Sequence, residues 1–447
     1  MFRKILIANR GEIAVRIIRA CKEMGISTVA VFSEADRNAL HVSMADESVC
    51  IGSARVQDSY LNIPSLLSAA VGTGAQAIHP GYGLLSENPR FAQLCKECNI
   101  AFIGPAAEHI TLLGDKEKAR STMQKAGVPV IPGAGLVPNA QAATKEAKKI
   151  GFPLLIKARA GGGGRGIRIV HKMEEVAAAF DAASEEAKMA FGDGNCYMER
   201  MLTNVKHVEM QLICDDHGNI ICLGERECSV QRKNQKLLEE SPSPAVSAPL
   251  RKKMMKASAL AAKSVGYRNV GTIEFLVDEK GQFYFMEMNT RLQVEHPVTE
   301  MVTGIDVVKW QIRVAAGMPL EFKQEDIQLR GHAIECRINA EDPNNNFTPS
   351  CGKIELLFIP GGNSIRFDTA LYQDYVVPPY YDSMLGKLIV HAGSRDEAVR
   401  KMQVALSELV IDGVKSTAEL QMDILEDETF LNGSYTTNFM AARGFKC

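Results

Sequence analysis

The sequence has no hydrophobic run long enough to cross a membrane and almost no net charge. Its longest apolar stretches fall far short of the ~18 residues that a span requires, and the start of the chain carries only the short run Ile5–Ala8. The 51 Lys and Arg residues are balanced by 53 Asp and Glu residues, which leaves a formal net charge of −2. No overall field then favours nucleic acid or acidic lipid. We therefore expect no signal peptide, no anchor, no nucleic-acid partner and a cytoplasmic location.

The 11 cysteines lack the spacing of a zinc site or of a disulfide framework. They are odd in number and scattered, and Cys95-x-x-Cys98 has no second Cys or His pair at zinc spacing. Reduced thiols in a cytosolic protein are the expected state. With 447 residues, 46% of them hydrophobic and 23% charged, the chain is long enough to bury a sizeable core in more than one lobe.

A nicotinamide dinucleotide site is disfavoured in the first 112 residues. Short β-rich runs at Lys4–Ala8 and Ser27–Phe32 alternate with a helical stretch at Ile13–Met24, which is the βαβ pattern of a parallel sheet. The first turn of that pattern, Asn9–Glu12, lacks the Gly-x-Gly-x-x-Gly fingerprint that such a site requires. Residues 1–112 therefore predict a Rossmann-like lobe without that cofactor.

The pattern changes after residue 113. Prolines and glycines crowd residues 129–138, which predicts a connector between lobes. Beyond it the sequence predicts hairpin turns at 215–219 and 278–281 and a helix at Arg251–Val265. Four further elements are predicted, namely strands at Leu154–Lys157, Ile167–Val170 and Lys353–Phe358 and a helix at Glu174–Phe191. A late helix is expected from Arg395.

The run Gly161–Gly166 satisfies Gly-x-Gly-x-x-Gly, but the predicted strand Ile167–Val170 follows it where that motif requires a helix. It also fails the P-loop spacing, because Ile167 stands where lysine is needed. The remaining functional interpretation is a hairpin whose backbone N–H groups fold over phosphates, with Lys157 and Arg165 supplying positive charge. The alternative is an ordinary surface loop.

The stretch Phe283–His296 alternates polar and apolar residues. If it stays extended, every second side chain faces the same way, and a face of five polar groups of mixed charge predicts the wall of a site. A solvated sheet face is the alternative. The residues that would share the polar face are Glu287, Asn289, Arg291, Gln293 and Glu295, and those that would face the core are Met288, Leu292 and Val294.

Glu274, on the predicted strand Gly271–Val277, stands roughly opposite Glu287. Two carboxylates at cross-strand distance repel each other unless a cation lies between them. Oxygen ligands from Glu274, Glu287 and Asn289 suit Mg²⁺ or Mn²⁺ carrying a nucleotide polyphosphate. We therefore expect metal only together with ATP.

Several stretches together resemble the biotin carboxylase family. They are Lys4–Ala14, His79–Asn88, the glycine run, Glu287–His296 and Tyr381–Lys387, so the resemblance covers essentially the whole chain. Carbamoyl-phosphate synthetases share parts of the glycine loop and of Glu-x-Asn-x-Arg, whereas the first run and the Arg-x-Gln-x-Glu-His ending together are specific. The resemblance implies α/β and α+β architecture: a Rossmann-like N-terminal lobe (1–112), an ATP-grasp domain (113–329) whose glycine-rich lid spans about 131–203, and a mixed α+β C-terminal lobe (330–447).

The resemblance also implies roles for individual residues. Bicarbonate would be bound by Lys236, Arg291, Gln293 and the backbone of Val294, with Glu295 as its general base. Biotin would face Arg337, with Tyr82 nearby, and the catalytic residues would be Arg291, Glu295, Lys236 and Arg337. Two Mg²⁺ or Mn²⁺ ions would be held by Glu274, Glu287 and Asn289. The nucleotide would contact Lys116, Lys157, Gly163, Gly164, Glu199, Arg200, Met201, Leu202, His207, Gln231, Asn234, Glu274 and Glu287.

The implied activity is ATP- and bicarbonate-dependent carboxylation of biotin through carboxyphosphate, as the first half-reaction of acetyl-CoA carboxylase in fatty acid biosynthesis. The sequence carries no Ala-Met-Lys-Met attachment motif, so biotin should arrive on a separate carrier protein, with carboxyltransferase subunits as further partners. Alternatives are the same subunit of another carboxylase, such as one for pyruvate, a carbamoyl-phosphate-type ligase, and a nucleotide sensor without turnover.

Three departures from the family pattern bear on the nucleotide site. Asn234 stands where the family usually has His, Arg159 replaces a small residue, and the turn between Glu274 and Glu287 is one residue longer, which a β-bulge could absorb. Arg337 has an alternative role as a plain ion pair with Glu335 or a neighbour.

One helix face carries the remaining expectation. Arg16, Arg19 and Glu23 lie three and four residues apart, and the matching face of the family belongs to a homodimer interface. Taken alone, it would be an ordinary solvated face.

Overall fold

The computed structural model describes residues 1–158 and 167–444. The predicted phosphate loop, with Gly163 and Gly164, and the neighbouring Arg159 and Arg165 lie outside these residues. Within the described part of the chain, no helix is both long and apolar enough to cross a membrane.

The N-terminal lobe is built on five parallel strands in the order β3-β2-β1-β4-β5, which confirms the predicted βαβ pattern. Its first helix buries Ile13, Ile17 and Ile18, which recur at helical spacing and cover the sheet. The strands are β1 (Lys4–Ile7), β2 (Ser27–Ser33), β3 (Glu47–Gly52), β4 (Ala77–His79) and β5 (Ala101–Phe102). The helices are α1 (Gly11–Glu23), α2 (Leu40–Met44), α3 (Ile63–Thr73), α4 (Pro89–Glu97) and α5 (Ala107–Gly114).

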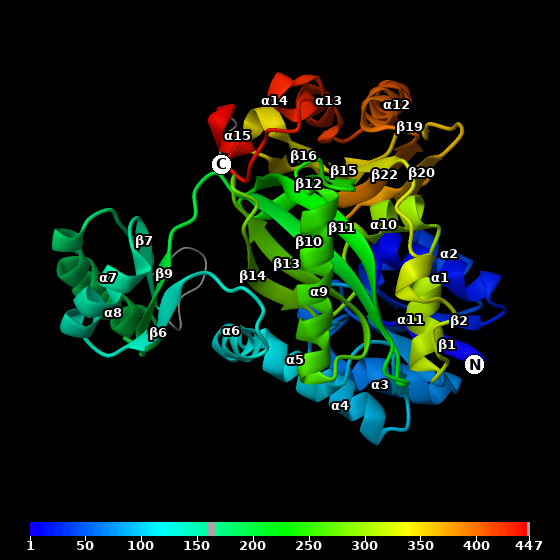
Figure 1. Cartoon of the computed structure of the whole chain (residues 1–447). Helices are drawn as coiled ribbons and strands as arrows, with labels where there is room; N and C mark the ends of the chain where they lie inside the picture. The colour runs from blue at the N-terminus through cyan, green and yellow to red at the C-terminus, as the bar shows by residue number, and fades with distance from the viewer. Residues whose placement is uncertain (159–166, 445–447) are drawn as a thin grey trace.

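A small lobe stands beside the rest of the molecule, joined to it by two extended segments (Figure 1). Its strands form an antiparallel sheet in the order β6-β9-β7-β8, packed against two helices. The helix predicted from Glu174 begins at Val176, after a single 3₁₀ turn, and the predicted connector at 129–138 contains β6. The elements are β6 (Gly133–Val137), α7 (Ala140–Ile150), β7 (Leu154–Ala158), β8 (Ile167–Val170), α8 (Val176–Phe191) and β9 (Cys196–Arg200), and α6 (Lys116–Lys125) precedes them.

A central sheet of eight strands, all antiparallel, runs in the order β14-β13-β10-β11-β12-β15-β22-β20. It continues across residue 330, so the predicted second and third domains share one sheet, and their boundary stays a prediction. The strands are β10 (Lys206–Cys214), β11 (Ile220–Arg232), β12 (Gln235–Ser241), β13 (Asn269–Val277), β14 (Phe283–Asn289), β15 (His332–Asn339), β20 (Ile365–Thr369) and β22 (Met384–Ala392).

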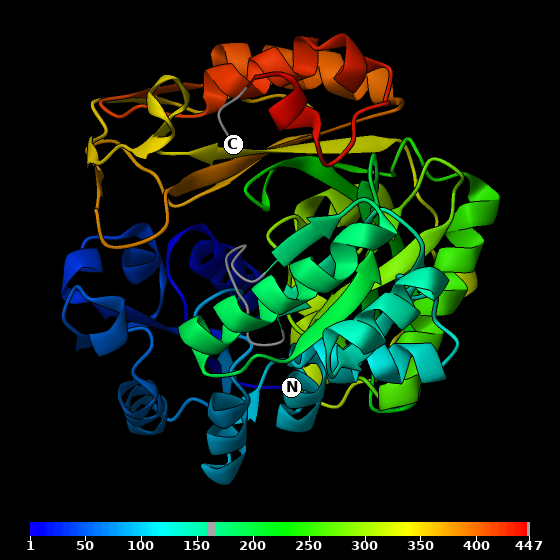
Figure 2. The same ribbon diagram turned by 90° about the vertical axis from the view of Figure 1, so that its left-hand side faces the viewer.

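Helices cover this sheet, and the last of them lie along one edge of the molecule (Figure 2). Helix α9 begins at Ala248, earlier than predicted, because Ser247 caps it and Pro249 lies in its first turn. The helices are α9 (Ala248–Val265), α10 (His296–Thr303), α11 (Val307–Ala315), α12 (Arg395–Glu408), α13 (Ala418–Glu426), α14 (Glu428–Leu431) and α15 (Phe439–Ala442). Three short strand pairs complete the fold: β16 (Glu341–Asp342) with β17 (Thr348–Pro349), β18 (Gly352–Lys353) with β21 (Val376–Val377), and β19 (Leu356–Phe358) with β23 (Val410–Asp412).

The register of the β13–β14 hairpin places Glu274 directly opposite Glu287, as predicted. Phe275 then pairs with Phe285, so Met286 is the extra residue of a β-bulge. The strand ends at Asn289, however, and the prediction that it stays extended to residue 296 is wrong. The Thr290 backbone N–H donates to Glu87 Oε1 at 3.0 Å instead of to the neighbouring strand.

The α1 face that carries Arg16, Arg19 and Glu23, expected at a homodimer interface or in solvent, is partly internal. Arg16 is buried and forms ion pairs with Glu300 at 2.8 Å and with Asp306 at 2.7 Å. Arg19 and Glu23 are exposed, and Glu23 pairs with Lys309 at 2.5 Å. The face therefore serves the packing of α1 on α10 and α11 as well as any contact with another chain.

Candidate active site

A cavity of about 1960 Å³ lies where the N-terminal lobe, the small lobe and the central sheet meet. Arg200 and Met201, at the end of β9, are not among the described residues that line it, and the Met201 N–H donates to the Pro153 carbonyl. The predicted site residues that do line it are Tyr82, Lys116, Lys157, Glu199, Leu202, His207, Gln231, Asn234, Lys236, Glu274, Glu287, Asn289, Arg291, Gln293, Val294, Glu295 and Arg337.

Lys236 is the centre of the polar wall. Its ammonium lies 2.6 Å from Glu295 Oε1, 2.7 Å from Glu209 Oε2 and 3.1 Å from Glu274 Oε1. Burial alone would lower the pKa of Lys236, but the three carboxylates outweigh it and raise the pKa well above its usual value. A fixed positive charge therefore stands inside the cavity at neutral pH.

Glu295 also pairs with a second cation, Arg337 of the C-terminal lobe. Arg337 on β15 donates to Glu295 Oε2 at 2.9 Å and to Glu239 Oε1 at 2.7 Å. Burial would raise the pKa of Glu295, but Lys236 and Arg337 hold it well below the usual value. The carboxylate is therefore in the form that can accept a proton. Of the ion-pair partners considered for Arg337, Glu335 is wrong, and the pairs form with the neighbouring Glu239 and Glu295.

Arg291 lies in the loop between β14 and α10, with its guanidinium oriented on three sides. It donates to Gln293 Oε1 at 2.7 Å, to Asn289 Oδ1 at 3.1 Å and to Glu87 Oε2 at 2.8 Å. Glu87 belongs to the N-terminal lobe, and its other oxygen accepts from Thr290. Although the strand ends early, these contacts keep Arg291 and Gln293 on the cavity side.

The predicted metal donors lie on neighbouring strands. Glu274 and Glu287 are cross-strand partners, and the Asn289 amide donates to Glu274 Oε1 at 2.8 Å. Glu287 is half-buried, 3.6 Å from the exposed ammonium of Lys116. His207 Nε2 lies 2.9 Å from Glu274 Oε2. Two carboxylates and an amide oxygen beside a cavity form a donor set that fits Mg²⁺ or Mn²⁺.

Another part of the cavity is lined by the small lobe and the β11–β12 hairpin. Lys157 of β7 forms an ion pair with Glu199 of β9, and Leu202 lies two residues beyond that strand. Asn234 occupies the turn between β11 and β12 with φ of 64°, a conformation that asparagine tolerates better than most residues. Gln231 is half-buried on the same hairpin.

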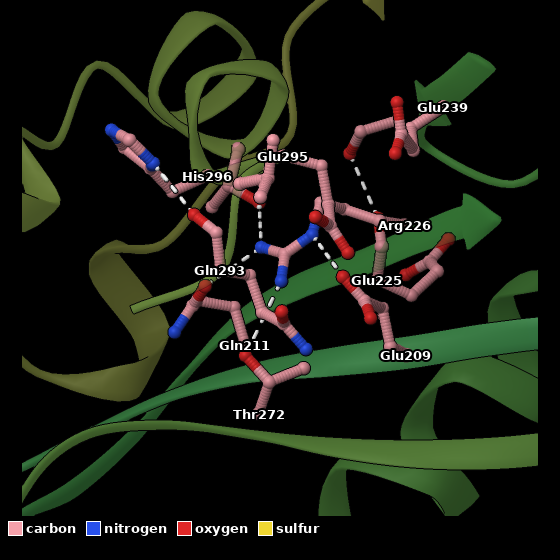
Figure 3. Close-up of polar contacts among 12 residues, drawn as sticks. Glu209, Gln211, Glu225, Arg226, Glu239, Thr272, Gln293, Glu295 and His296 are labelled. Carbon is pink, nitrogen blue, oxygen red and sulfur yellow. Dashed lines mark hydrogen bonds and ion pairs between the residues drawn. The ribbon is translucent and has the colours of Figure 1, made fainter. Parts of the chain in front are cut away.

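A second row of buried polar residues, which was not predicted from the sequence, lies beneath this wall. Arg226 is fully buried and donates to Glu209 Oε1 at 2.5 Å, to Gln211 Oε1 at 2.7 Å and to Thr299 Oγ1 at 2.8 Å (Figure 3). His207, Glu209 and Gln211 alternate along β10, so the period-two pattern was available in the sequence for that strand. The partners on β11 and α10 could not be inferred from it.

The fold and this site together define a protein of the ATP-grasp class, in which an antiparallel sheet carries carboxylates and cations opposite a small strand-and-helix lobe. Family models agree with the class. They match residues 1–110 as the N-terminal domain of biotin carboxylase, 115–323 as the ATP-binding domain of the carbamoyl-phosphate synthase L chain, and 335–442 as the C-terminal domain of biotin carboxylase. The chain belongs to the biotin carboxylase family.

Individual relatives support this membership over the whole chain. Biotin carboxylase 1 of Bacillus subtilis is 54% identical, with 98% of each chain covered. The biotin carboxylase–β-γ-ATP complex of Campylobacter jejuni is 51% identical, with a TM-score of 0.92 and 99% of each chain covered. The biotin carboxylase domain dimer of Hydrogenobacter thermophilus 2-oxoglutarate carboxylase, in complex with MgADP, ADP and bicarbonate, is 50% identical over 99% and 98% of the two chains, with a TM-score of 0.91.

Proposed function

We propose that this chain uses ATP to carboxylate biotin with bicarbonate, biotin being carried on a separate protein. The observation that carries the proposal is that Lys236 and Arg337 both pair with the ionised Glu295, while Arg291 lines the same cavity. Two cations paired with one buried base, and a third cation lining the same cavity, suit a small planar anion that must be oriented and deprotonated.

Bicarbonate would bind between Arg291 and Lys236, with Gln293 and the Val294 backbone completing the contacts. The planar guanidinium fork of Arg291 is oriented by Asn289, Gln293 and Glu87 before any ligand enters. Glu295 would remove the proton, because Lys236 and Arg337 keep its carboxylate ionised. The bicarbonate oxygen then attacks the γ-phosphoryl group of ATP, giving carboxyphosphate and ADP.

The nucleotide would lie between the small lobe and the central sheet. Lys116 and Lys157 would contact its phosphates, and Leu202, His207, Gln231 and Asn234 would line the rest of its pocket. Glu274, Glu287 and Asn289 would hold two Mg²⁺ or Mn²⁺ ions. These ions would neutralise the charge of the transferring phosphoryl group. The nucleotide would also contact Glu199, Arg200 and Met201, and the glycine loop would act as its lid.

Biotin would face Arg337, with Tyr82 beside it. Carboxyphosphate breaks down to CO₂ and phosphate, and phosphate takes the ureido proton of biotin. Arg337 would stabilise the enolate that results, as a fixed positive charge beside a developing anion. Water must be kept out while carboxyphosphate exists, since the mixed anhydride would otherwise hydrolyse.

The finer assignment is the first half-reaction of acetyl-CoA carboxylase in fatty acid biosynthesis. We further propose a homodimer located in the cytoplasm, partnered by a biotin carboxyl carrier protein and carboxyltransferase subunits, and a division of the chain at residues 112 and 329. The Hydrogenobacter relative is part of a 2-oxoglutarate carboxylase. The acyl acceptor of this chain is therefore tested by assays with carrier and carboxyltransferase partners.

The reaction itself is tested by ADP release from the purified chain with MgATP. We expect ADP release to require bicarbonate and to rise when free biotin is added, while ammonia leaves it unchanged. Stimulation by ammonia would support a carbamoyl-phosphate-type ligase, and nucleotide binding without any release of ADP would support a sensor. Either outcome would overturn the proposal.

A further inference from the structure

A buried ion pair joins the N-terminal and C-terminal lobes at the edge of the cavity. Lys387 Nζ lies 3.2 Å from Glu12 Oε1, and the Lys387 side chain is completely buried. Glu12 comes from the first turn of α1, whereas Lys387 comes from β22, where it pairs in register with Arg337 of β15. Both residues belong to stretches that resemble the family, Lys4–Ala14 and Tyr381–Lys387, but neither has a role in the reaction proposed above.

The ammonium of Lys387 reaches a third part of the chain. It donates to the Val294 carbonyl at 2.8 Å. That carbonyl belongs to the peptide group that joins Val294 to Glu295, so its orientation sets where the Glu295 side chain begins. Lys387 therefore holds the loop that carries the proposed bicarbonate contacts, although it does not itself line the cavity.

The carboxylate of Glu12 connects the same ammonium to Tyr82. The Tyr82 hydroxyl donates to Glu12 Oε1, the oxygen that also faces Lys387. The Tyr82 backbone is fixed as well, because the Asn9 amide donates to its carbonyl at 2.8 Å. A continuous chain of contacts thus runs from Tyr82, on the biotin side of the cavity, through Glu12 and Lys387 to Val294 on the bicarbonate side.

Burial makes this chain sensitive to the loss of any member. Glu12 is buried, and among the described residues its Oε2 atom has no hydrogen-bond partner, so the carboxylate depends on Oε1 for all its polar contacts. A buried charge that loses its partner is strongly unfavourable. The ammonium of Lys387 would then shift toward other acceptors and release Val294.

We propose that Glu12 and Lys387 are positioning residues that couple the biotin side of the active site to its bicarbonate side. This inference rests on the proposed function. Its distinctive consequence is that Tyr82, which would lie beside biotin, also affects the binding of bicarbonate when no biotin is present.

The experiment measures bicarbonate-dependent ADP release without biotin for the wild type, Tyr82→Phe and Glu12→Gln. Tyr82→Phe keeps the ring and removes the hydrogen bond to Glu12. We expect it to raise the KM for bicarbonate at least about threefold, and Glu12→Gln to raise it about tenfold, which is the factor that one charge-assisted hydrogen bond provides. In both variants the KM for ATP should change less than about twofold, because distant sites behave independently of each other.

The C-terminal lobe offers a matched control with the same chemistry. The Tyr435 hydroxyl donates to the buried Glu240, which also pairs with Arg395 at 2.7 Å, and neither Tyr435 nor Glu240 lines the cavity. Tyr435→Phe and Glu240→Gln should lower thermal stability and leave the KM for bicarbonate unchanged.

The outcomes separate the two proposals. A wild type without bicarbonate-dependent ADP release would overturn the proposed function and this inference with it. An active wild type whose KM for bicarbonate is unaffected by Tyr82→Phe would overturn the coupling alone. An equal rise of the KM values for ATP and bicarbonate would also overturn it, because it would indicate general damage. If Glu12→Gln fails to fold, Tyr82→Phe still decides.

Discussion

At the scale of single residues, the buried charges are arranged in pairs because none of them could be buried alone. Lys236 and Arg337 between them contact four carboxylates, and two of these, Glu209 and Glu274, also hold another cation or amide. Removing one partner from such a network leaves an uncompensated charge, at a cost of about 3–5 kcal/mol. Substitutions at its rim therefore test the chemistry more cleanly than substitutions at its centre.

Arg291 is the rim residue best suited to such a test. Its side chain is about one-fifth exposed, and the proposed mechanism requires its guanidinium to orient bicarbonate. We expect Arg291→Ala to lower bicarbonate-dependent ADP release at least about 100-fold, the usual effect of removing one group that stabilises developing charge. The matched control is Arg268→Ala, which removes an exposed arginine paired with Asp216 and should leave turnover near that of the wild type. Turnover of Arg291→Ala within a few-fold of the wild type would contradict the mechanism.

At the scale of elements, the central sheet brings together residues that lie far apart in the chain. Strand β15 pairs with β12 on one side and β22 on the other, which brings Arg337 within reach of Glu239 and next to Lys387 in register. The start of β15 has little free space. Gly331, directly before the strand, has φ of 65°, and a Cβ atom there would lie 2.2 Å from the Ala392 carbonyl oxygen.

Gly331→Ala should therefore destabilise the protein more than the same change at a glycine with free space. Gly266, which ends α9, has φ of 62°, and a Cβ atom added there would have no heavy atom of another part of the chain within 4 Å. Both substitutions carry the backbone cost of about 1–2 kcal/mol for a left-handed residue, and only Gly331→Ala adds a clash with backbone. Thermal melts of the two variants and the wild type measure the difference. Equal losses of stability would show that β15 can shift to accept the side chain.

At the scale of the whole molecule, the N-terminal lobe contributes Glu12 and Tyr82 to the lining of the cavity and Glu87 as a partner of Arg291. Its own core contains buried neutral histidines. Burial lowers the pKa of His41 to about 4 and that of His79 to about 3. The unfolded chain binds a proton at each of these residues below about pH 6.5, while the folded lobe does not. Stability of this lobe is therefore present at neutral pH and decreases as the pH falls.

His41→Gln tests this account. The variant loses the contact of His41 Nε2 with the Val31 carbonyl, at 3.2 Å, so it should be less stable than the wild type at pH 8. Between pH 6.5 and pH 5 only the wild type loses stability through this residue. The difference in stability between the wild type and His41→Gln should therefore narrow by about 2 kcal/mol. Thermal melts from pH 8 to pH 5 measure it, with the exposed His171 changed to Gln as control. A difference in stability that stays constant with pH would contradict the interpretation of His41 as a buried neutral histidine.

The strands and helices of this fold could be predicted where the pattern was local. The parallel sheet of the N-terminal lobe and the hairpin that opposes Glu274 and Glu287 follow from alternation and turn residues in neighbouring sequence. The bulge in β14 was expected from the resemblance, because the turn of this hairpin is one residue longer than the family pattern. The end of β14 at Asn289 could not be predicted, because it depends on Glu87, some two hundred residues earlier, which takes the hydrogen bond of Thr290.

By itself, the sequence predicted which side chains would carry the proposed chemistry and, through the stretches that resemble biotin carboxylase, determined which family the chain belongs to. Only the tertiary structure decided how those side chains are held. Glu209, Glu239 and Arg226 became part of the site, and Glu12 became linked to Lys387, because an antiparallel sheet places distant strands side by side. A buried charge is stable only beside its partner, and the identity of that partner is a property of the folded chain.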